Sequence, residues 1–478
     1  MPRLKVLFVV SECVPLVKTG GLGDVAGVLP QALAARGHDV RVIMPRYRSA
    51  TAYPAERRPE PLVAPLGGGE RWCGLWEGRL EGDVPIYLLE HDVLYDRDGL
   101  YGDTFGEFGD NLLRYALLSR ASLELPAAIG WEPDVFHVHD WQSALVPVYQ
   151  RVLGRPATSV LTIHNLGYQG RFGREAADAL GIDPGAYGWL GLECFGDVNL
   201  LQAGITCATA LSTVSPRYAQ EIQTPLGGAG LDGALAARGR DLVGVLNGID
   251  EEIWDPRSDP HIAERFGVDD LDRGKAACKA ALQLELGLPV RPEVPLVGLV
   301  SRFAWQKGID IFARAVEMLH GEDIQFAVLG SGESWAEELF GRWDDELPHF
   351  AARCRFDEGL AHRIEAGADL FAMPSRYEPC GLNQMYSLAY GTPPIVHRTG
   401  GLADTVRLFD RRTGTGNGFV FDHFDANGLA WALDYALGCW SDRAAWARLM
   451  QNGMREDFTW DRRVGEYVSL YRMLVPEA

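Results

Sequence analysis

Glycines and a lysine near the N-terminus form a motif suited to binding an anion. The run Lys18-Thr19-Gly20-Gly21-Leu22-Gly23-Asp24 follows an apolar segment, 5–10, and precedes a helical pattern that Gly37 is placed to end. Glycines before a helix let the backbone approach a ligand closely, and the free N–H groups of a helix start attract negative charge. The motif indicates an anion site with Lys18 beside it, and the alternative is a tight strand-to-helix connection.

The same glycines do not make a dinucleotide fingerprint. Gly21, Gly23 and Ala26 fit the spacing G-x-G-x-x-A. That motif, however, begins almost directly after the first strand, and an acidic residue ends the second strand. Here residues 11–20 intervene, and the second predicted strand, 39–44, runs into Pro45-Arg46. A nicotinamide dinucleotide is therefore not expected.

Polar side chains follow two predicted strands of the first half. The clusters are His137-Val138-His139-Asp140-Trp141 and Thr162-Ile163-His164-Asn165. Ligands of open α/β sheets bind beyond the carboxyl ends of the strands, where these residues fall. A single histidine is more often structural, but two such clusters at successive strand ends favour a functional site.

The second half supplies cations and a carboxylate at comparable positions. Arg302 follows a predicted strand and Lys307 opens the next helix. A planar guanidinium and a point-charge ammonium together suit a diphosphate, although exposed cations are common on any surface. Glu378, in Ser375-Arg376-Tyr377-Glu378-Pro379-Cys380-Gly381-Leu382, is placed either to accept hydrogen bonds from sugar hydroxyls or to cap a helix.

The elements that position these residues alternate between apolar strand-like runs and helical patterns, which predicts a parallel α/β architecture. The first series of strands is predicted at 5–10, 39–44, 84–89, 134–139, 159–164, 211–214 and 242–246. The second is predicted at 296–300, 325–329, 369–374 and 394–397. We expect two doubly wound halves that meet in the sequence near residue 247, and a last helix, 463–474, that could belong to either.

Two further segments carry predictions. Residues 47–110 are expected to form long surface loops around a hairpin, and their aromatic residues make either a capped loop or a flap that stacks on sugar rings. Residues 398–404 repeat the N-terminal motif as Arg-Thr-Gly-Gly-Leu-Ala-Asp. From this repeat we infer a glycine-rich helix start in each half, both directed toward one shared cleft.

Composition excludes several classes of protein. With 478 residues, 47% hydrophobic and 23% charged, the chain is expected to be globular with two or more domains. A formal charge of −20 argues against a nucleic-acid or anionic-membrane binder. The eight cysteines lack metal-ligand or paired spacing, which favours reduced thiols and a cytoplasmic location. No signal peptide or membrane span is predicted.

Several motifs occur together in one order along the chain. They are Lys-x-Gly-Gly-Leu, His-Asp-Trp, His-Asn-Leu-x-Tyr-Gln-Gly, Asn-Gly-Ile-Asp, Ser-Arg-Phe-x-x-Gln-Lys-Gly, Ser-Arg-Tyr-Glu-Pro-Cys-Gly-Leu and Thr-Gly-Gly-Leu-Ala-Asp-Thr-Val. This set resembles the bacterial glycogen synthases and plant starch synthases over roughly residues 3–470. No single motif is specific, but the ordered set is.

The resemblance implies a fold and an activity. The fold would be two facing Rossmann-like domains of the GT-B type with the active site in the cleft between them. Residues 1–247, which the C-terminal helix at 461–478 could join, would form the acceptor side, and residues 248–460 the nucleotide-sugar side. The activity would be retaining transfer of glucose from ADP-glucose to the non-reducing 4-hydroxyl of an α-1,4-glucan, without a cofactor or a metal. Neither nucleic acid nor membrane is an expected partner, and the oligomeric state is open.

The resemblance also implies roles for matching residues. The implied catalytic residues are His164, Asp140, Arg302, Lys307 and Glu378. The implied donor-binding residues are Lys18, Gly20, Gly21, Asp24, Asn165, Asn247, Gln306, Cys380, Gly381 and Leu382. The wider superfamily often has a second glutamate, eight residues after the first, that reaches the ribose. Tyr386 stands there in this chain, so ribose recognition is expected elsewhere.

Retention of configuration sets the expected mechanism. Double displacement would need a carboxylate nucleophile close to the anomeric carbon, and no residue stands out for that role. We therefore expect substitution on one face, with the departing diphosphate taking the acceptor's proton. The alternatives are a related transferase that uses UDP-glucose or a small acceptor, and a glucan-binding protein without activity.

Overall fold

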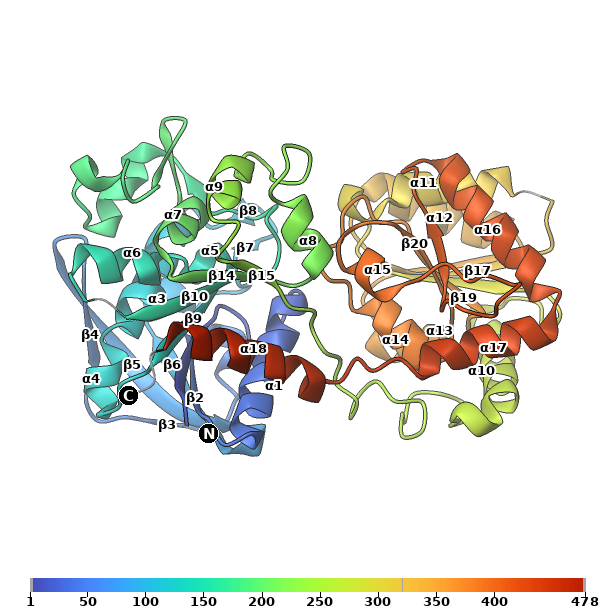
Figure 1. Cartoon of the computed structure of the whole chain (residues 1–478), viewed down its shortest axis with the longest axis horizontal. Helices are drawn as coiled ribbons and strands as arrows, with labels where there is room; N and C mark the ends of the chain where they lie inside the picture. The colour runs from blue at the N-terminus through green and yellow to red at the C-terminus, as the bar shows by residue number, and fades with distance from the viewer. Residues whose placement is uncertain (1–2, 156, 320, 476–478) are drawn as a thin grey trace. The chain divides into compact units, whose positions relative to one another are not determined.

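The computed structural model describes residues 3–155, 157–319 and 321–475, and the chain divides into two compact units. Unit 1 comprises Met1–Gly248 together with Trp460–Ala478, and unit 2 comprises Ile249–Thr459. Figure 1 shows helices around a central sheet in each unit. Unit 1 is therefore built from two stretches that are far apart in the sequence.

The main sheet of unit 1 has parallel strands flanked by an antiparallel edge. Its strands lie in the order β15 (Leu242–Gly244), β14 (Ala210–Thr213), β10 (Thr158–Ile163), β9 (Val135–His139), β1 (Lys5–Val9), β2 (Asp39–Pro45), β6 (Val84–Glu90), β5 (Gly69–Leu80) and β3 (Ala55–Arg57), and β4 (Leu62–Leu66) pairs with β5. The chain runs from β1 outward through β2 and β6, and returns to add β9, β10 and β14 on the other side. This 3-2-1-4-5-6 order confirms the Rossmann-like class for unit 1.

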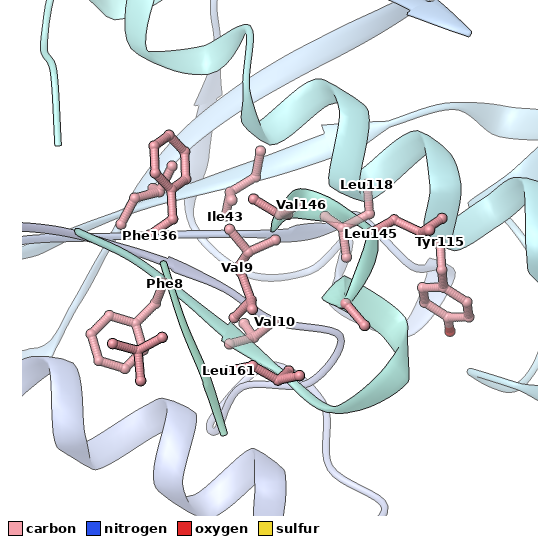
Figure 2. Close-up of a cluster of buried hydrophobic side chains, with 14 of the residues drawn as sticks. Phe8, Val9, Val10, Ile43, Tyr115, Leu118, Phe136, Leu145, Val146 and Leu161 are labelled. Atoms are coloured by element: carbon pink, nitrogen blue, oxygen red, sulfur yellow. The ribbon is translucent and has the colours of Figure 1, made fainter. Parts of the chain in front are cut away.

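The central strands are buried on both faces, which explains their near-continuous apolar sequence. Residues Phe8, Val9 and Val10 have no exposed surface. Figure 2 shows them among side chains from neighbouring strands and from helices α3 (Asn111–Ser122) and α6 (Leu145–Val152), with Ile43, Tyr115, Leu118, Phe136, Leu145, Val146 and Leu161 labelled. This packing fixes the carboxyl end of β1, from which the first glycine-rich loop leaves.

Helices cover the sheet of unit 1. They are α1 (Gly21–Ala35), α2 (Asp92–Tyr95), α3 (Asn111–Ser122), α4 (Leu125–Ile129), α5 (Asp140–Ser143), α6 (Leu145–Val152), α7 (Leu200–Cys207), α8 (Pro216–Glu221), α9 (Asp232–Ala237) and α18 (Trp460–Leu474). Helix α18 lies beside α1 (Figure 1) and buries Trp460, Val464, Tyr467 and Tyr471 in the core of unit 1. The last helix of the chain thus belongs to unit 1.

The prediction of long surface loops at 47–110 was wrong in part. This segment forms β3–β6, and β5 extends the main sheet by pairing antiparallel with β6. The alternation of apolar and polar residues on β5 is interrupted by polar and aromatic side chains, including Trp72 and Trp76. For this reason the sequence pattern did not predict the strand. A short hairpin follows, β7 (Gly102–Asp103) and β8 (Gly106–Glu107), and a small separate sheet holds β11 (Arg171–Phe172), β13 (Asp197–Asn199) and β12 (Glu193–Cys194).

The sheet of unit 2 is parallel throughout. Its strands lie in the order β18 (Phe350–Cys354), β17 (Gln325–Gly330), β16 (Leu296–Val300), β19 (Leu370–Met373), β20 (Pro394–His397) and β21 (Phe419–Phe421). Its helices are α10 (Leu271–Leu286), α11 (Ile309–Met318), α12 (Ser334–Glu346), α13 (Glu358–Gly367), α14 (Asn383–Ala389), α15 (Gly400–Thr405), α16 (Ala426–Trp440) and α17 (Arg443–Met454). Counted from β16, the order is again 3-2-1-4-5-6, so both halves have the predicted class.

Candidate active site

Each sheet has one point where the strand order reverses. In unit 1 it lies between β1 and β9, and in unit 2 between β16 and β19. Ligands of doubly wound sheets bind beyond the carboxyl ends of the strands at such a point. The loops that leave these four strands carry most of the site residues predicted from the sequence.

In unit 1, the loop after β1 is held by a glutamate that belongs to none of the sequence motifs. Glu12 is buried and accepts four hydrogen bonds. Its Oε2 accepts from the backbone N–H groups of Thr19, at 2.5 Å, and Gly20, at 3.3 Å. Its Oε1 accepts from the Thr19 hydroxyl, at 2.6 Å, and from the hydroxyl of Tyr101. One carboxylate therefore fixes the turn that begins α1.

Gly20 leaves space beside the helix start. A Cβ built on Gly20 would meet no other heavy atom within 4 Å. Helix α1 begins at Gly21, and Lys18 lies beside it with 48% of its side chain exposed and its Nζ 2.7 Å from Oδ1 of Asp24. Lys18, Gly20, Gly21 and Asp24 are thus brought together in an arrangement suited to an anionic group.

The loop after β9 begins with a strained aspartate. Asp140 adopts a left-handed backbone conformation, φ +51°, which is uncommon for a residue other than glycine. Its Oδ1 accepts hydrogen bonds from the N–H groups of His164, at 2.7 Å, and Asn165, at 3.4 Å. Burial raises the pKa of Asp140 to about 7. Asn165 in turn accepts from the N–H of Gly167, so Asp140 orders the loop after β10.

A chain of buried histidines supports His164. Nε2 of His164 lies 3.0 Å from Nδ1 of His139, and the ring of His139 packs on that of His137 with centroids 4.2 Å apart. His137 bonds through Nε2 to Thr162, at 2.6 Å, and through Nδ1 to the hydroxyl of Tyr471 on α18, at 2.8 Å. Burial lowers the pKa of His137 and of His164 to about 3, and that of His139 well below its usual value, so all three rings are neutral.

In unit 2, the loops after β16 and β19 are joined by an ion pair. Nζ of Lys307 lies 2.6 Å from Oε2 of Glu378, which also accepts from the Ser375 hydroxyl at 2.9 Å. Glu378 is buried, whereas Lys307 keeps 20% of its side chain exposed. Gln306 donates to the carbonyl of Tyr377 at 3.3 Å and links the two loops again. The side chain of Arg302 is exposed and has no ion-pair partner in the described part of the chain.

The segment after Glu378 turns on a glycine. Gly381 has φ +70°, which an L side chain rarely adopts, and it separates buried Cys380 from Leu382, the residue before α14. The repeated Gly-Gly pair packs here. The N–H of Gly401 donates to the carbonyl of Glu378 at 3.1 Å, and a Cβ on Gly400 would collide with the same carbonyl. The second Gly-Gly pair therefore supports the Glu378 segment, whereas Gly20 of the first pair leaves open space.

Asn247 lies near the end of the first stretch of unit 1. It is buried, and its Oδ1 has no hydrogen-bonding partner among the described residues. Within those residues no cluster of three histidine, cysteine or acidic side chains is arranged to hold a metal ion. The described helices also include none with the length and apolar character to cross a membrane.

Both halves of the chain match known family models. Residues 5–237 match the starch synthase catalytic domain, and residues 288–452 match the glycosyl transferases group 1. Relatives include a glycogen synthase of Anaeromyxobacter dehalogenans, 50% identical over 99% of this chain and 100% of its own length. Another is glycogen synthase 1 of Geobacter sulfurreducens, 49% identical over 98% of this chain and 96% of its own length.

Two solved structures are similar to this chain over nearly its full length. The catalytic domain of starch synthase IV from Arabidopsis thaliana, bound to ADP and acarbose, is 33% identical, with a TM-score of 0.90 over 99% of this chain and 100% of that one. A sucrose-phosphate synthase from Thermosynechococcus elongatus, 19% identical with a TM-score of 0.62 over 99% of both chains, shares the fold alone. Full-length likeness and ordered motifs agree, and this chain belongs to the glycogen synthase and starch synthase family of GT-B glycosyltransferases.

Proposed function

We propose that this chain is a cytoplasmic glycogen synthase that transfers glucose from ADP-glucose to the non-reducing end of an α-1,4-glucan with retention of configuration. One observation carries the proposal. A cation and a carboxylate, Lys307 and Glu378, are held together at the point of unit 2 where doubly wound sheets bind ligands. The relatives named glycogen synthase and the plant enzyme bound to ADP and acarbose support the choice of donor and acceptor.

The diphosphate of the donor would be bound by cations and helix N–H groups. Unit 2 supplies Arg302, whose exposed guanidinium is available to a ligand, and Lys307, whose ammonium is oriented by Glu378. Unit 1 supplies Lys18 and the open helix start at Gly20 and Gly21. Positive charge held in place before the reaction stabilises the charge that grows on a leaving group.

Each unit carries groups suited to binding the hydroxyls of glucose. Glu378 accepts from hydroxyls, and the backbone around Cys380, Gly381 and Leu382 can approach closely because Gly381 has no side chain. On unit 1, His164 supplies a ring edge held by His139. Asp140 acts through His164 and Asn165, since its Oδ1 already accepts their N–H groups. Asp24, Asn247 and Gln306 would orient these groups.

The reaction would then proceed on one face of the sugar. The bond between the anomeric carbon and the diphosphate oxygen breaks, and a bond forms between that carbon and the acceptor's 4-hydroxyl oxygen. The hydroxyl proton passes to the departing diphosphate. Neither carboxylate assigned to the sugar is left as an evident nucleophile, because Asp140 binds backbone and Glu378 binds Lys307.

The test is incorporation of labelled glucose into glycogen, with ADP-glucose and UDP-glucose compared side by side. Strong transfer from ADP-glucose is the expected result. Transfer from UDP-glucose alone would keep the chemistry and overturn the donor. Absence of transfer from either would overturn the proposed activity and lead to the small-acceptor and binding-protein alternatives.

A further inference from the structure

The histidine chain of unit 1 contains a group that the proposed reaction does not use. His139 is fully buried, and its ring contacts His164 on one side and His137 and Phe8 on the others. Its Nδ1 bonds to His164, but its Nε2 has no hydrogen-bonding partner among the described residues. A buried polar atom without a partner calls for an explanation.

The hydrogen bond between the two rings admits two proton arrangements. A neutral imidazole has one N–H and one lone pair, so only one of the two facing nitrogens carries a hydrogen. If Nδ1 of His139 donates, its Nε2 keeps an unpaired lone pair and His164 carries its hydrogen on Nδ1. If Nε2 of His164 donates instead, His139 must carry a buried N–H that donates to nothing.

The two arrangements differ in cost. Buried N–H groups without an acceptor are rarer in folded proteins than buried acceptors without a donor. The environment of His139 therefore favours the first arrangement. The hydrogen bond made by one ring nitrogen decides which form the ring takes at the other.

We propose that His139 is a positioning residue that holds His164 in the Nδ1–H form, so that His164 presents a hydrogen-bond donor to an oxygen of the bound sugar. The described residues include no hydrogen-bond partner for Nδ1 of His164, and the side chain keeps some exposure, unlike His137 and His139. The role in sugar binding rests on the proposed function; the assignment of the hydrogen does not.

The hydrogen positions can be measured without any substrate. Long-range ¹H–¹⁵N spectra of the full chain with ¹⁵N-labelled histidine, at pH 8, distinguish Nδ1–H from Nε2–H rings. Two other histidines serve as references within the same sample. Nδ1 of His38 accepts from the N–H of Leu4, at 3.2 Å, so its hydrogen is on Nε2, whereas Nδ1 of His397 donates to the carbonyl of Ser375, at 2.9 Å.

The signal of His164 is identified as the one missing from a His164→Gln variant. An Nδ1–H pattern like that of His397 is the expected result. An Nε2–H pattern like that of His38 would overturn the proposal, whether or not the chain transfers glucose.

A matched pair of amide variants tests the consequence for catalysis. The side-chain nitrogen of asparagine replaces Nδ1 of histidine, and that of glutamine replaces Nε2. We expect His139→Asn to keep the Nδ1–H form of His164 and most of the kcat. We expect His139→Gln to lose about tenfold or more in kcat with a smaller change in the donor KM. Equal kcat in the two variants, with both folded, would overturn the positioning role.

Discussion

The ammonium of Lys307 lies 2.6 Å from the buried carboxylate of Glu378, so each charge fixes the other before any substrate binds. If Lys307 stabilises the departing diphosphate, Lys307→Ala should lower kcat by about 100- to 1,000-fold, or about 2.7–4 kcal/mol, and raise the donor KM much less. Steady-state kinetics with ADP-glucose and glycogen measure both constants.

Arg412→Ala is the control for this prediction. Arg412 is also a cation of unit 2, but 85% of its side chain is exposed and its nearest carboxylate oxygen, on Asp410, is 3.8 Å away. An exposed pair of this kind contributes little, so we expect kcat to stay within about twofold. A Lys307→Ala enzyme with unchanged kcat would contradict the proposed role of Lys307.

Glu12 should control donor affinity through the loop that it holds. In Glu12→Gln an amide NH₂ replaces one carboxylate oxygen and faces the donors of Thr19, Gly20 or Tyr101. Since hydrogen bonds to a charged group contribute about 1.5–3 kcal/mol, the donor KM should rise about 10- to 100-fold. Tyr101→Phe removes one donor and leaves the contacts to Thr19 and Gly20, so its effect should be smaller. Equal effects of the two substitutions would argue against the loop contacts.

Asp140 should make stability depend on pH in an unusual direction. Burial raises its pKa in the folded chain to about 7, whereas the unfolded value is near 4. Between these values the folded chain holds a proton that the unfolded chain has released, so the free energy of unfolding falls as pH rises. The stability that protonated Asp140 contributes is fully present below pH 4 and is lost by about pH 7. Over this range the free energy of unfolding falls by up to about 1.4 kcal/mol per pH unit.

Asp140→Asn removes this titration and keeps an oxygen for the N–H groups of His164 and Asn165. Urea unfolding of both proteins at several pH values between 4.5 and 7.5 gives the comparison. We expect the stability of the wild type to decline relative to the variant over this range. Parallel curves would show that Asp140 titrates at its ordinary value.

The hydroxyl of Tyr471 should stabilise unit 1 through His137. Tyr471→Phe leaves Nδ1 of a fully buried histidine without its partner, which costs about 1–3 kcal/mol. Ser469→Ala, an exposed change on the same helix, should stay within about 0.5 kcal/mol. Urea unfolding measures the free energy of unfolding of each variant, and hydrogen exchange assigns each transition to its unit. If Tyr471→Phe lowers the free energy of unfolding no more than Ser469→Ala does, the Tyr471 hydroxyl does not stabilise unit 1.

Pattern and composition predicted the strands that are long and buried on both faces. The strand predicted at 84–89 is Val84–Glu90, and that at 325–329 is Gln325–Gly330. They could not predict β21, whose three residues become a strand only by pairing with β20. Nor could they predict β18, Phe350–Cys354, where charged and small residues break the apolar run.

The candidate site was predictable where motifs are local and hidden where partners are distant. The clusters around Asp140 and His164 were visible because each follows a strand directly. Glu12 belongs to no motif, and only the folded loop shows that it binds Thr19 and Gly20, seven and eight positions away, and Tyr101, 89 positions away. The structural role of the second Gly-Gly pair could not be predicted either, because only its packing against Glu378 distinguishes it from the first pair.

The return of α18 to unit 1 has a consequence for how the protein is made. A ribosome synthesises Ile249–Thr459 before it adds Trp460–Leu474. The whole of unit 2 is therefore translated before the helix that packs beside α1 exists. Domains usually fold in the order of their synthesis, but here the unit that is translated first receives its last helix only after the whole of the other unit has been synthesised.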